Sequence, residues 1–128
     1  MKKILIVDDS EFMRKVLKDY LINKIDGVSL AEEVEIYEAD GRINALKLFK
    51  KNKPDVILLD VVMKDSPTEG LEFLEEIKNE FDTKRIIMLS SIGQTSVMEA
   101  CKQFGIISYL HKPFDPDLVI EAINRALH

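Results

Sequence analysis

The sequence predicts an α/β protein in which helices cover both faces of a parallel sheet. Short apolar runs such as Ile4–Val7 and Val56–Leu59 are rich in β-branched residues and do not alternate with polar ones. Such runs are typical of strands that are buried on both faces. Helical patterns separate the runs, and strict alternation of strand and helix indicates parallel strands joined by right-handed crossovers.

Five strands are expected along the chain. They are Ile4–Val7, Val34–Glu38, Val56–Leu59, Ile86–Leu89 and Ile106–Leu110. The second run alternates polar and apolar residues, so we expect it to lie half exposed at an edge of the sheet.

Apolar residues at helical spacing predict five helices between and after these strands. The stripes are Phe12, Met13, Val16, Leu17, Tyr20 and Leu21; Ile43, Leu46 and Phe49; Leu71, Leu74 and Ile77; Val97, Ala100, Cys101 and Phe104; and Leu118, Val119, Ala122, Ile123 and Ala126. The sequence also predicts where two of the helices start. Asp115 is expected to cap a helix that begins at Pro116. Ser66–Glu69 has the pattern of a capping box, with Pro67 at the first helical position.

The 128 residues suit one domain, and the composition excludes several classes of protein. The net charge of −5 argues against a nucleic-acid partner and against docking on anionic lipid. The single cysteine rules out an internal disulfide. No apolar run approaches the ~18 residues of a membrane span, so we expect a cytoplasmic protein.

Polar residues follow four of the predicted strands. Asp8 and Asp9 follow the first strand, Asp60 the third, Ser90 the fourth and Lys112 the fifth. In such sheets ligands bind beyond the carboxyl ends of the strands, so we expect these side chains to share one edge.

Carboxylate oxygens with no histidine or cysteine nearby select hard cations such as Mg²⁺, Mn²⁺ or Ca²⁺ over zinc. An aspartate beside such a metal can attack phosphorus and form an acyl phosphate. Lys112 could pair with the carboxylates and contact phosphoryl oxygens, and Ser90 could donate a hydrogen bond to one of them.

Ordinary structural roles remain open for each of these residues. Asp8–Ser10 could cap a helix, Lys112 could be solvated and Ser90 could be a capping hydroxyl. Tyr109 could be a half-buried core aromatic, and His111 is expected to be a solvated histidine at a strand end.

The motifs Ile4–Ser10, Asp55–Met63, Leu89–Ser91 and Lys112–Phe114 resemble, in order, those of the receiver domain of bacterial two-component response regulators. The resemblance covers the whole chain. It implies a flavodoxin-like, doubly wound (βα)5 fold with strand order 2-1-3-4-5, and a single receiver domain over residues 1–128 without an output domain.

The resemblance also implies roles for particular residues. Asp60 would accept a phosphoryl group from a histidine kinase, and Lys112 and Ser90 would contact its oxygens. Mg²⁺, or Mn²⁺ in its place, would be held by Asp8, Asp9, Asp60 and the backbone carbonyl of Val62. Tyr109 would act with Ser90 as a switch that reshapes the face of the fourth helix, fifth strand and fifth helix. Such a protein is a phosphoacceptor switch that assists its own phosphorylation and dephosphorylation, and is not otherwise an enzyme.

Ser10–Arg14 and Ser91–Gln94 are similar to the stand-alone chemotaxis regulators of the CheY type. That branch implies a CheA-like kinase and a flagellar switch protein as partners. The alternative is an isolated receiver that passes its phosphoryl group along a phosphorelay or regulates another output.

Two departures from the family pattern affect the site. Lys64 stands where the family usually has proline, and Lys64–Gly70 is about two residues longer than usual. Val62 and Ile92, two residues beyond Asp60 and Ser90, are apolar and cannot orient an attacking water. We therefore expect slow autodephosphorylation and reliance on a separate phosphatase.

Two other classes fit less well. A hydrolase of the haloacid-dehalogenase type needs a second aspartate where Val62 stands, and its cap domain does not fit within 128 residues. A flavodoxin-like cofactor carrier needs a hydroxyl-rich phosphate loop, whereas Asp8 and Asp9 would repel a phosphate.

Overall fold

Five parallel strands form one sheet, in the order β2-β1-β3-β4-β5, in the computed structural model of the protein. The structure describes residues 1–22, 33–60, 63, 68–91 and 95–128. The strands are β1 (Lys2–Val7), β2 (Val34–Ala39), β3 (Val56–Asp60), β4 (Ile86–Ser90) and β5 (Ser108–His111). The helices are α1 (Glu11–Ile22), α2 (Arg42–Asn52), α3 (Glu69–Ile77), α4 (Thr95–Lys102) and α5 (Pro116–Leu127), with a short 3₁₀ helix, η1, at Thr83–Arg85. The predicted fold class and strand order are confirmed.

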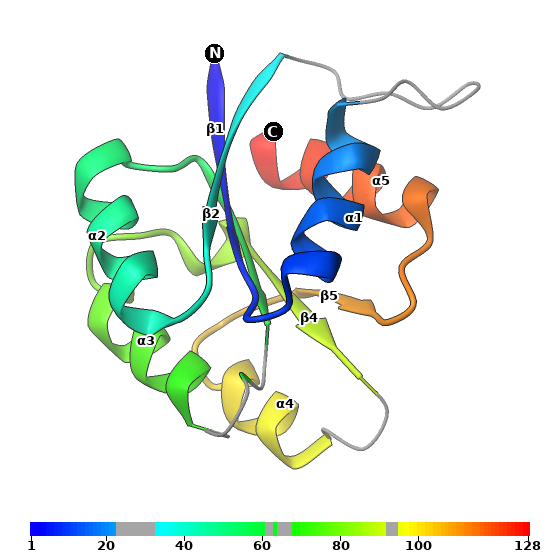
Figure 1. Ribbon diagram of the computed structural model, residues 1–128. Coiled ribbons are helices and arrows are strands. Elements are labelled where there is room, and N and C mark those ends of the chain that lie inside the picture. Colours follow the sequence, from blue (N-terminus) through cyan, green and yellow to red (C-terminus); the bar gives the residue numbers. More distant parts are fainter. Residues whose placement is uncertain (23–32, 61–62, 64–67, 92–94) are drawn as a thin grey trace.

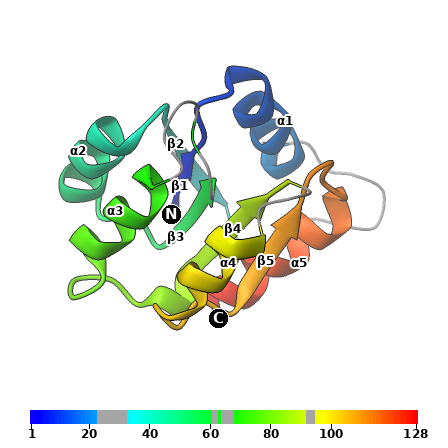
Figure 2. The same ribbon diagram turned by 90° about the horizontal axis from the view of Figure 1, so that it is seen from below.

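Helices lie on both faces of the sheet, with α1 and α5 on one face and α2, α3 and α4 on the other (Figures 1 and 2). Alternate strand residues supply the two cores. Ile4 and Ile6 pack toward α1 and α5, whereas Leu5 and Val7 pack toward the other three helices. Each fully buried aliphatic side chain contributes roughly 1.5–3 kcal/mol relative to an exposed one.

The central strands β3 and β4 are buried along their whole length, as their unbroken apolar runs predict. The edge strand β2 has the expected half-exposed pattern. The other edge strand, β5, begins at Ser108, two residues later than predicted. Ile106 is nevertheless buried, whereas Ile107 is exposed, so the apolar run there extends beyond the strand.

Three residues of the predicted helical stripes, which were expected in the core, are exposed instead. Phe12 is 72% exposed, Ile43 64% and Leu118 53%. On α1 the buried stripe passes through Leu17 and Leu21, one turn apart. Successive residues of a helix are rotated by about 100°, so an apolar residue one or two positions off such a stripe turns away from the sheet.

The start of α5 is as predicted, because Asp115 is its N-cap and accepts a hydrogen bond from the backbone N–H of Asp117 at 2.9 Å, with Pro116 in the first turn. The helix α3 begins at Glu69, later than the predicted start at Pro67. Ser66 and Pro67, which complete the predicted capping box, lie outside the described residues. In the described ranges, the structure contains no helix that is long and apolar enough to cross a membrane.

Candidate functional site

Three carboxylates meet at the carboxyl edge of the sheet. The strands β1 and β3 are neighbours in register, with Val7 opposite Leu59, so Asp8 and Asp60 leave the sheet side by side. One oxygen atom from each of Asp8, Asp9 and Asp60 lies within 4.8 Å of the others. Asp8 and Asp60 are buried and Asp9 is partly buried. The structure therefore brings together the three acidic residues that the sequence placed at this edge.

Lys112 reaches this cluster from the end of β5. Its ammonium nitrogen lies 3.2 Å from Asp8 Oδ2 and 3.5 Å from Asp60 Oδ2, and its side chain is 18% exposed. Its backbone N–H donates to the carbonyl of Ser90 at 2.7 Å, which ties the ends of β4 and β5 together. The Lys112–Pro113 peptide bond is cis. Since Lys112 carries one positive charge, it balances at most one of the three carboxylates.

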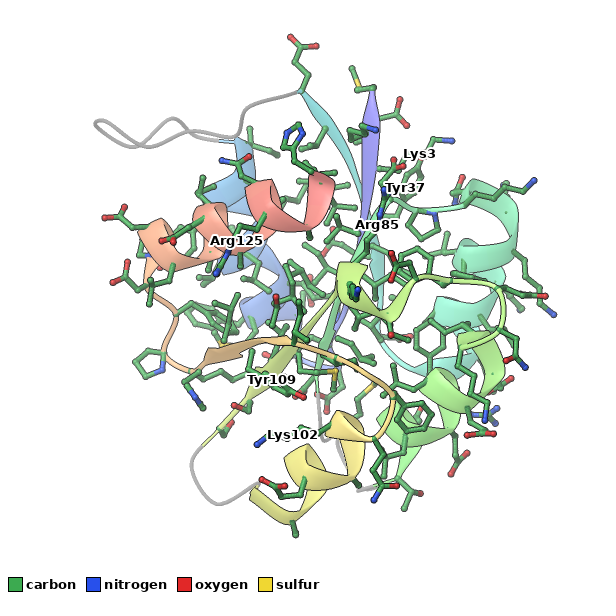
Figure 3. The ribbon with its side chains drawn as sticks, turned by 180° about the vertical axis from the view of Figure 1, so that it is seen from behind. Lys3, Tyr37, Arg85, Lys102, Tyr109 and Arg125 are labelled. Atoms are coloured by element: carbon green, nitrogen blue, oxygen red, sulfur yellow. The ribbon has the colours of Figure 1, made fainter. Side chains whose placement is uncertain are left out.

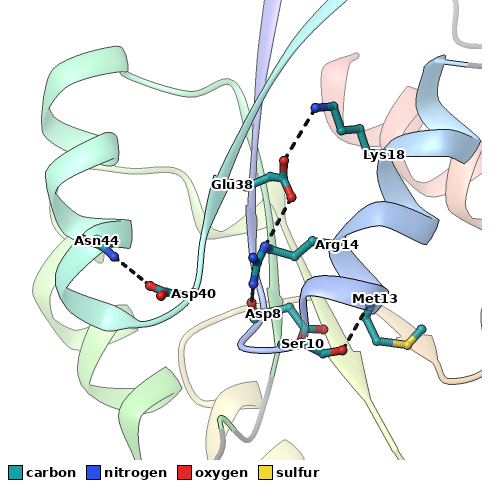
Figure 4. Close-up of polar contacts among 8 residues, drawn as sticks. All are labelled: Asp8, Ser10, Met13, Arg14, Lys18, Glu38, Asp40 and Asn44. Atoms are coloured by element: carbon teal, nitrogen blue, oxygen red, sulfur yellow. Dashed lines mark hydrogen bonds and ion pairs between the residues drawn. The ribbon is translucent and has the colours of Figure 1, made fainter.

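The loop after β1 is held by hydrogen bonds that Figure 4 shows in part. Asp8 Oδ1 accepts from the backbone N–H of Ser10 at 2.9 Å, and Ser10 Oγ accepts from the N–H of Met13 at 3.2 Å. The helix-capping role that remained open for Asp8–Ser10 therefore belongs to Ser10. Ser10 caps α1, and the carboxylate of Asp9 lies in the cluster with Asp8 and Asp60.

Arg14 braces the same loop, a contact that the sequence did not indicate. Its Nη1 donates to the backbone carbonyl of Asp8 at 2.7 Å, and its Nε donates to Glu38 on β2 at 3.2 Å (Figure 4). Lys18 lies 3.6 Å from the other oxygen of Glu38. These contacts join α1, β2 and the end of β1, so the position of Asp8 is fixed from two sides.

Ser90 and His111 form a contact that sequence reasoning missed. The two residues are opposite each other in the β4–β5 pairing, and Ser90 Oγ lies 2.9 Å from His111 Nδ1. Ser90 is fully buried, whereas His111 is exposed as a residue, in keeping with its expected place at a strand end. The sequence could not show the contact because the register of β4 against β5 decides which residues face each other.

Tyr109 and Cys101 lie on the α4 side of the sheet. Tyr109, which Figure 3 labels on β5, is half-buried and packs against the core on that side. Its hydroxyl donates to the carbonyl of Ile106 at 3.0 Å. Burial raises the pKa of the Tyr109 hydroxyl. Cys101 is fully buried on α4, as predicted, and burial raises the pKa of its thiol to about 11.

A groove opens beside the carboxylates, lined by Asp9, Asp40, Gly41, Arg42, Ile43, Asn44 and Glu69. Glu69 accepts a hydrogen bond from the backbone N–H of Arg42 at 2.6 Å, which links the start of α3 to the start of α2. Val62, Ile92 and residues 64–67, for which the sequence made further predictions, lie outside the described residues.

The chain matches the model of the response regulator receiver domain over residues 4–124. It is 39% identical over 128 residues to the chemotaxis protein CheY of Halobacterium salinarum, covering 98% of this chain and 97% of that protein. It is 36% identical over 126 residues to the chemotaxis protein CheY of Bacillus subtilis, covering 98% of each chain. A solved structure of a response regulator receiver domain protein from Clostridium thermocellum superposes with a TM-score of 0.80 at 28% identity, covering 99% of this chain and 94% of that one.

The chain therefore belongs to the receiver domains of two-component response regulators.

Proposed function

We propose that this protein is a signalling switch that is activated when Asp60 accepts a phosphoryl group from a histidine kinase. The observation that supports this most directly is the cluster of Asp8, Asp9 and Asp60 with Lys112 across it, within 3.5 Å of two of the carboxylates. Membership of the receiver family gives the cluster its interpretation.

In the proposed reaction, a carboxylate oxygen of Asp60 attacks the phosphorus of a phosphohistidine on the kinase. An O–P bond forms, the P–N bond breaks, and the leaving imidazole keeps the electron pair and takes up a proton. Lys112 then contacts the phosphoryl oxygens as a point charge, and the Ser90 hydroxyl donates a hydrogen bond to one of them.

A divalent metal fits the donor set, because three carboxylates offer oxygen ligands and Lys112 balances only part of their charge. We propose that Asp8, Asp9, Asp60 and the backbone carbonyl of Val62 hold Mg²⁺, for which Mn²⁺ can substitute. When bound, the ion would neutralise negative charge on the carboxylates and on the incoming phosphoryl oxygens.

Phosphorylation would be read out through Ser90 and Tyr109. A phosphoryl group adds close to two negative charges and three acceptor oxygens, which would draw the Ser90 hydroxyl toward Asp60. Tyr109, whose hydroxyl now bonds to the loop carbonyl of Ile106, would then move into the space behind Ser90. The face made by α4, β5 and α5 would change shape and bind a partner.

We further propose a role in chemotaxis, with a CheA-like kinase upstream and a flagellar switch protein downstream. The similarity to two chemotaxis proteins along the whole chain supports this choice. The alternative is an isolated receiver in a phosphorelay. A pull-down of the phosphorylated protein with a flagellar switch peptide and, separately, with a histidine phosphotransfer domain distinguishes the two.

The lifetime of the phosphoryl group is proposed to be long, because Val62 and Ile92 are apolar and cannot orient a water for hydrolysis. A separate phosphatase would then end the signal. The double substitution Val62→Asn/Ile92→Glu should shorten the half-life measured with radiolabelled phosphate, and an unchanged half-life would contradict this proposal.

The proposed function is tested by amide NMR spectra in Mg²⁺ before and after addition of beryllofluoride, a phosphoryl mimic. We expect shifts around Asp60, Ser90 and Tyr109 in the wild type and none in Asp60→Asn. If Mg²⁺ shifts the aspartate resonances but beryllofluoride changes nothing, the domain is not a phosphorylation switch.

A further inference from the structure

His111 contacts a residue of the proposed phosphoryl site without belonging to that site. Its Nδ1 atom lies 2.9 Å from the Ser90 hydroxyl oxygen, across the β4–β5 pairing. The backbone bond from Lys112 to the Ser90 carbonyl fixes the two strand ends against each other, so this contact is built into the sheet.

The direction of this hydrogen bond follows from burial. Ser90 is fully buried, and among the residues that the structure describes His111 is its side-chain hydrogen-bond partner. If Nδ1 carried the proton, the hydroxyl hydrogen of Ser90 would lack an acceptor among those residues, which is costly for a buried group. The favoured arrangement is therefore the one in which the Ser90 hydroxyl donates to Nδ1.

A serine hydroxyl has one hydrogen and can donate it to one acceptor at a time. On the proposed function, a phosphoryl oxygen on Asp60 needs the same hydrogen that His111 Nδ1 accepts. Phosphorylation must then exchange one acceptor for the other. His111 is exposed, so water can solvate its ring nitrogen once the bond is broken.

We propose that His111 is a positioning residue that competes with the phosphoryl group for the Ser90 hydroxyl and thereby opposes activation. This inference rests on the proposed function of Asp60 and adds a residue that sets the affinity of the switch for its phosphoryl signal. Such competition weakens the interaction of the Ser90 hydroxyl with the phosphoryl group by the net free energy of one hydrogen bond.

The test is titration of beryllofluoride in Mg²⁺, followed by amide NMR, on the wild type and two variants. His111→Val keeps a residue that suits a strand but removes the acceptor. His111→Asn is the matched control, because its amide oxygen, one bond from Cγ as Nδ1 is, can accept from Ser90. We expect His111→Val to bind beryllofluoride about fivefold more tightly than the wild type, and His111→Asn to bind within about twofold of it.

The ¹⁵N resonances of the His111 ring give a second measurement. In the wild type, Nδ1 should show the signature of an unprotonated hydrogen-bond acceptor, which beryllofluoride should shift and the Ser90→Ala substitution should abolish. A general loss of packing would not produce this signature. If packing alone explained the effect of His111→Val, the asparagine variant would not keep the affinity of the wild type for beryllofluoride.

Three results would overturn the inference. One is unchanged or weaker binding by His111→Val, which would mean that the histidine does not compete or supports the phosphorylated form. Another is an equal gain in beryllofluoride affinity in both variants, which would mean that the effect does not depend on the hydrogen bond between His111 and Ser90. The third is a wild type that binds Mg²⁺ but no beryllofluoride, and this result alone also removes the proposed function.

Discussion

Replacing Asp60 with asparagine should stabilise the protein when no divalent cation is bound. The carboxylate of Asp60 lies 3.5 Å from the Lys112 ammonium and within 4.8 Å, oxygen to oxygen, of Asp8 and Asp9. Among the charged groups of the described residues, the substitution removes one attraction and two repulsions, and it nearly preserves the shape of the side chain. Its sign therefore depends on which of these is larger.

Coulomb's law gives the expected size. With an effective dielectric constant of about 20, the attraction at 3.5 Å is about 5 kcal/mol, and each repulsion, over at most 4.8 Å, is at least about 3.5 kcal/mol. The two repulsions exceed the attraction by at least about 2 kcal/mol, and solvent at the partly exposed Asp9 reduces that difference. We expect Asp60→Asn to gain about 1–2 kcal/mol of unfolding free energy, or a rise of roughly 3–8 °C in Tm.

The assay is urea unfolding followed by circular dichroism in EDTA, with Glu121→Gln on the exposed face of α5 as a control for net charge. Adding Mg²⁺ should reverse the order, because an ion that binds the native state stabilises the wild type more than a variant lacking one carboxylate. A variant that is less stable than the wild type in EDTA would refute the reasoning, since the Lys112 attraction would then outweigh the repulsion.

Three further outcomes are expected from unfolding experiments. Glu69→Ala should cost about 1 kcal/mol, because its carboxylate accepts the 2.6 Å hydrogen bond from the Arg42 N–H at the start of α2, whereas Glu69→Gln should cost less. Burial raises the pKa of the Cys101 thiol from 9.0 to about 11, so the unfolded chain releases a proton that the native protein keeps. Stability should therefore fall by about 1 kcal/mol between pH 8 and pH 10, and Cys101→Ala should remove that part of the pH dependence. Phe73→Ala should cost about 3–5 kcal/mol in urea unfolding, because Phe73 is fully buried on the core-facing side of α3; a loss below 1 kcal/mol would contradict that packing.

The edge of the sheet that holds the site could be predicted because it depends only on where strands end. Asp8 and Asp60 each follow an uninterrupted apolar run, and parallel strands bring such ends to one edge. The doubly wound layout follows from strict alternation of strand and helix. The approach of Lys112 to two carboxylates follows from the same rule applied to β5.

What depends on packing and register could not be predicted in the same way. Phe12 has the chemistry of a core residue, but its side chain is 72% exposed because α1 is rotated to bury Leu17 and Leu21. The contact between Ser90 and His111 needs the pairing of β4 with β5 to be known residue by residue. Hydrophobicity along the chain does not contain that information.

The most direct test of the central claim is to locate a phosphoryl group on Asp60. The protein would be incubated with acetyl phosphate and Mg²⁺, and intact mass spectrometry would be followed by borohydride reduction and peptide mapping. We expect a mass increase of one phosphoryl group in the wild type, conversion of residue 60 to homoserine on reduction, and neither in Asp60→Asn. A phosphoryl group on another residue, or an equal mass increase in Asp60→Asn, would contradict the role of Asp60 as the phosphoacceptor.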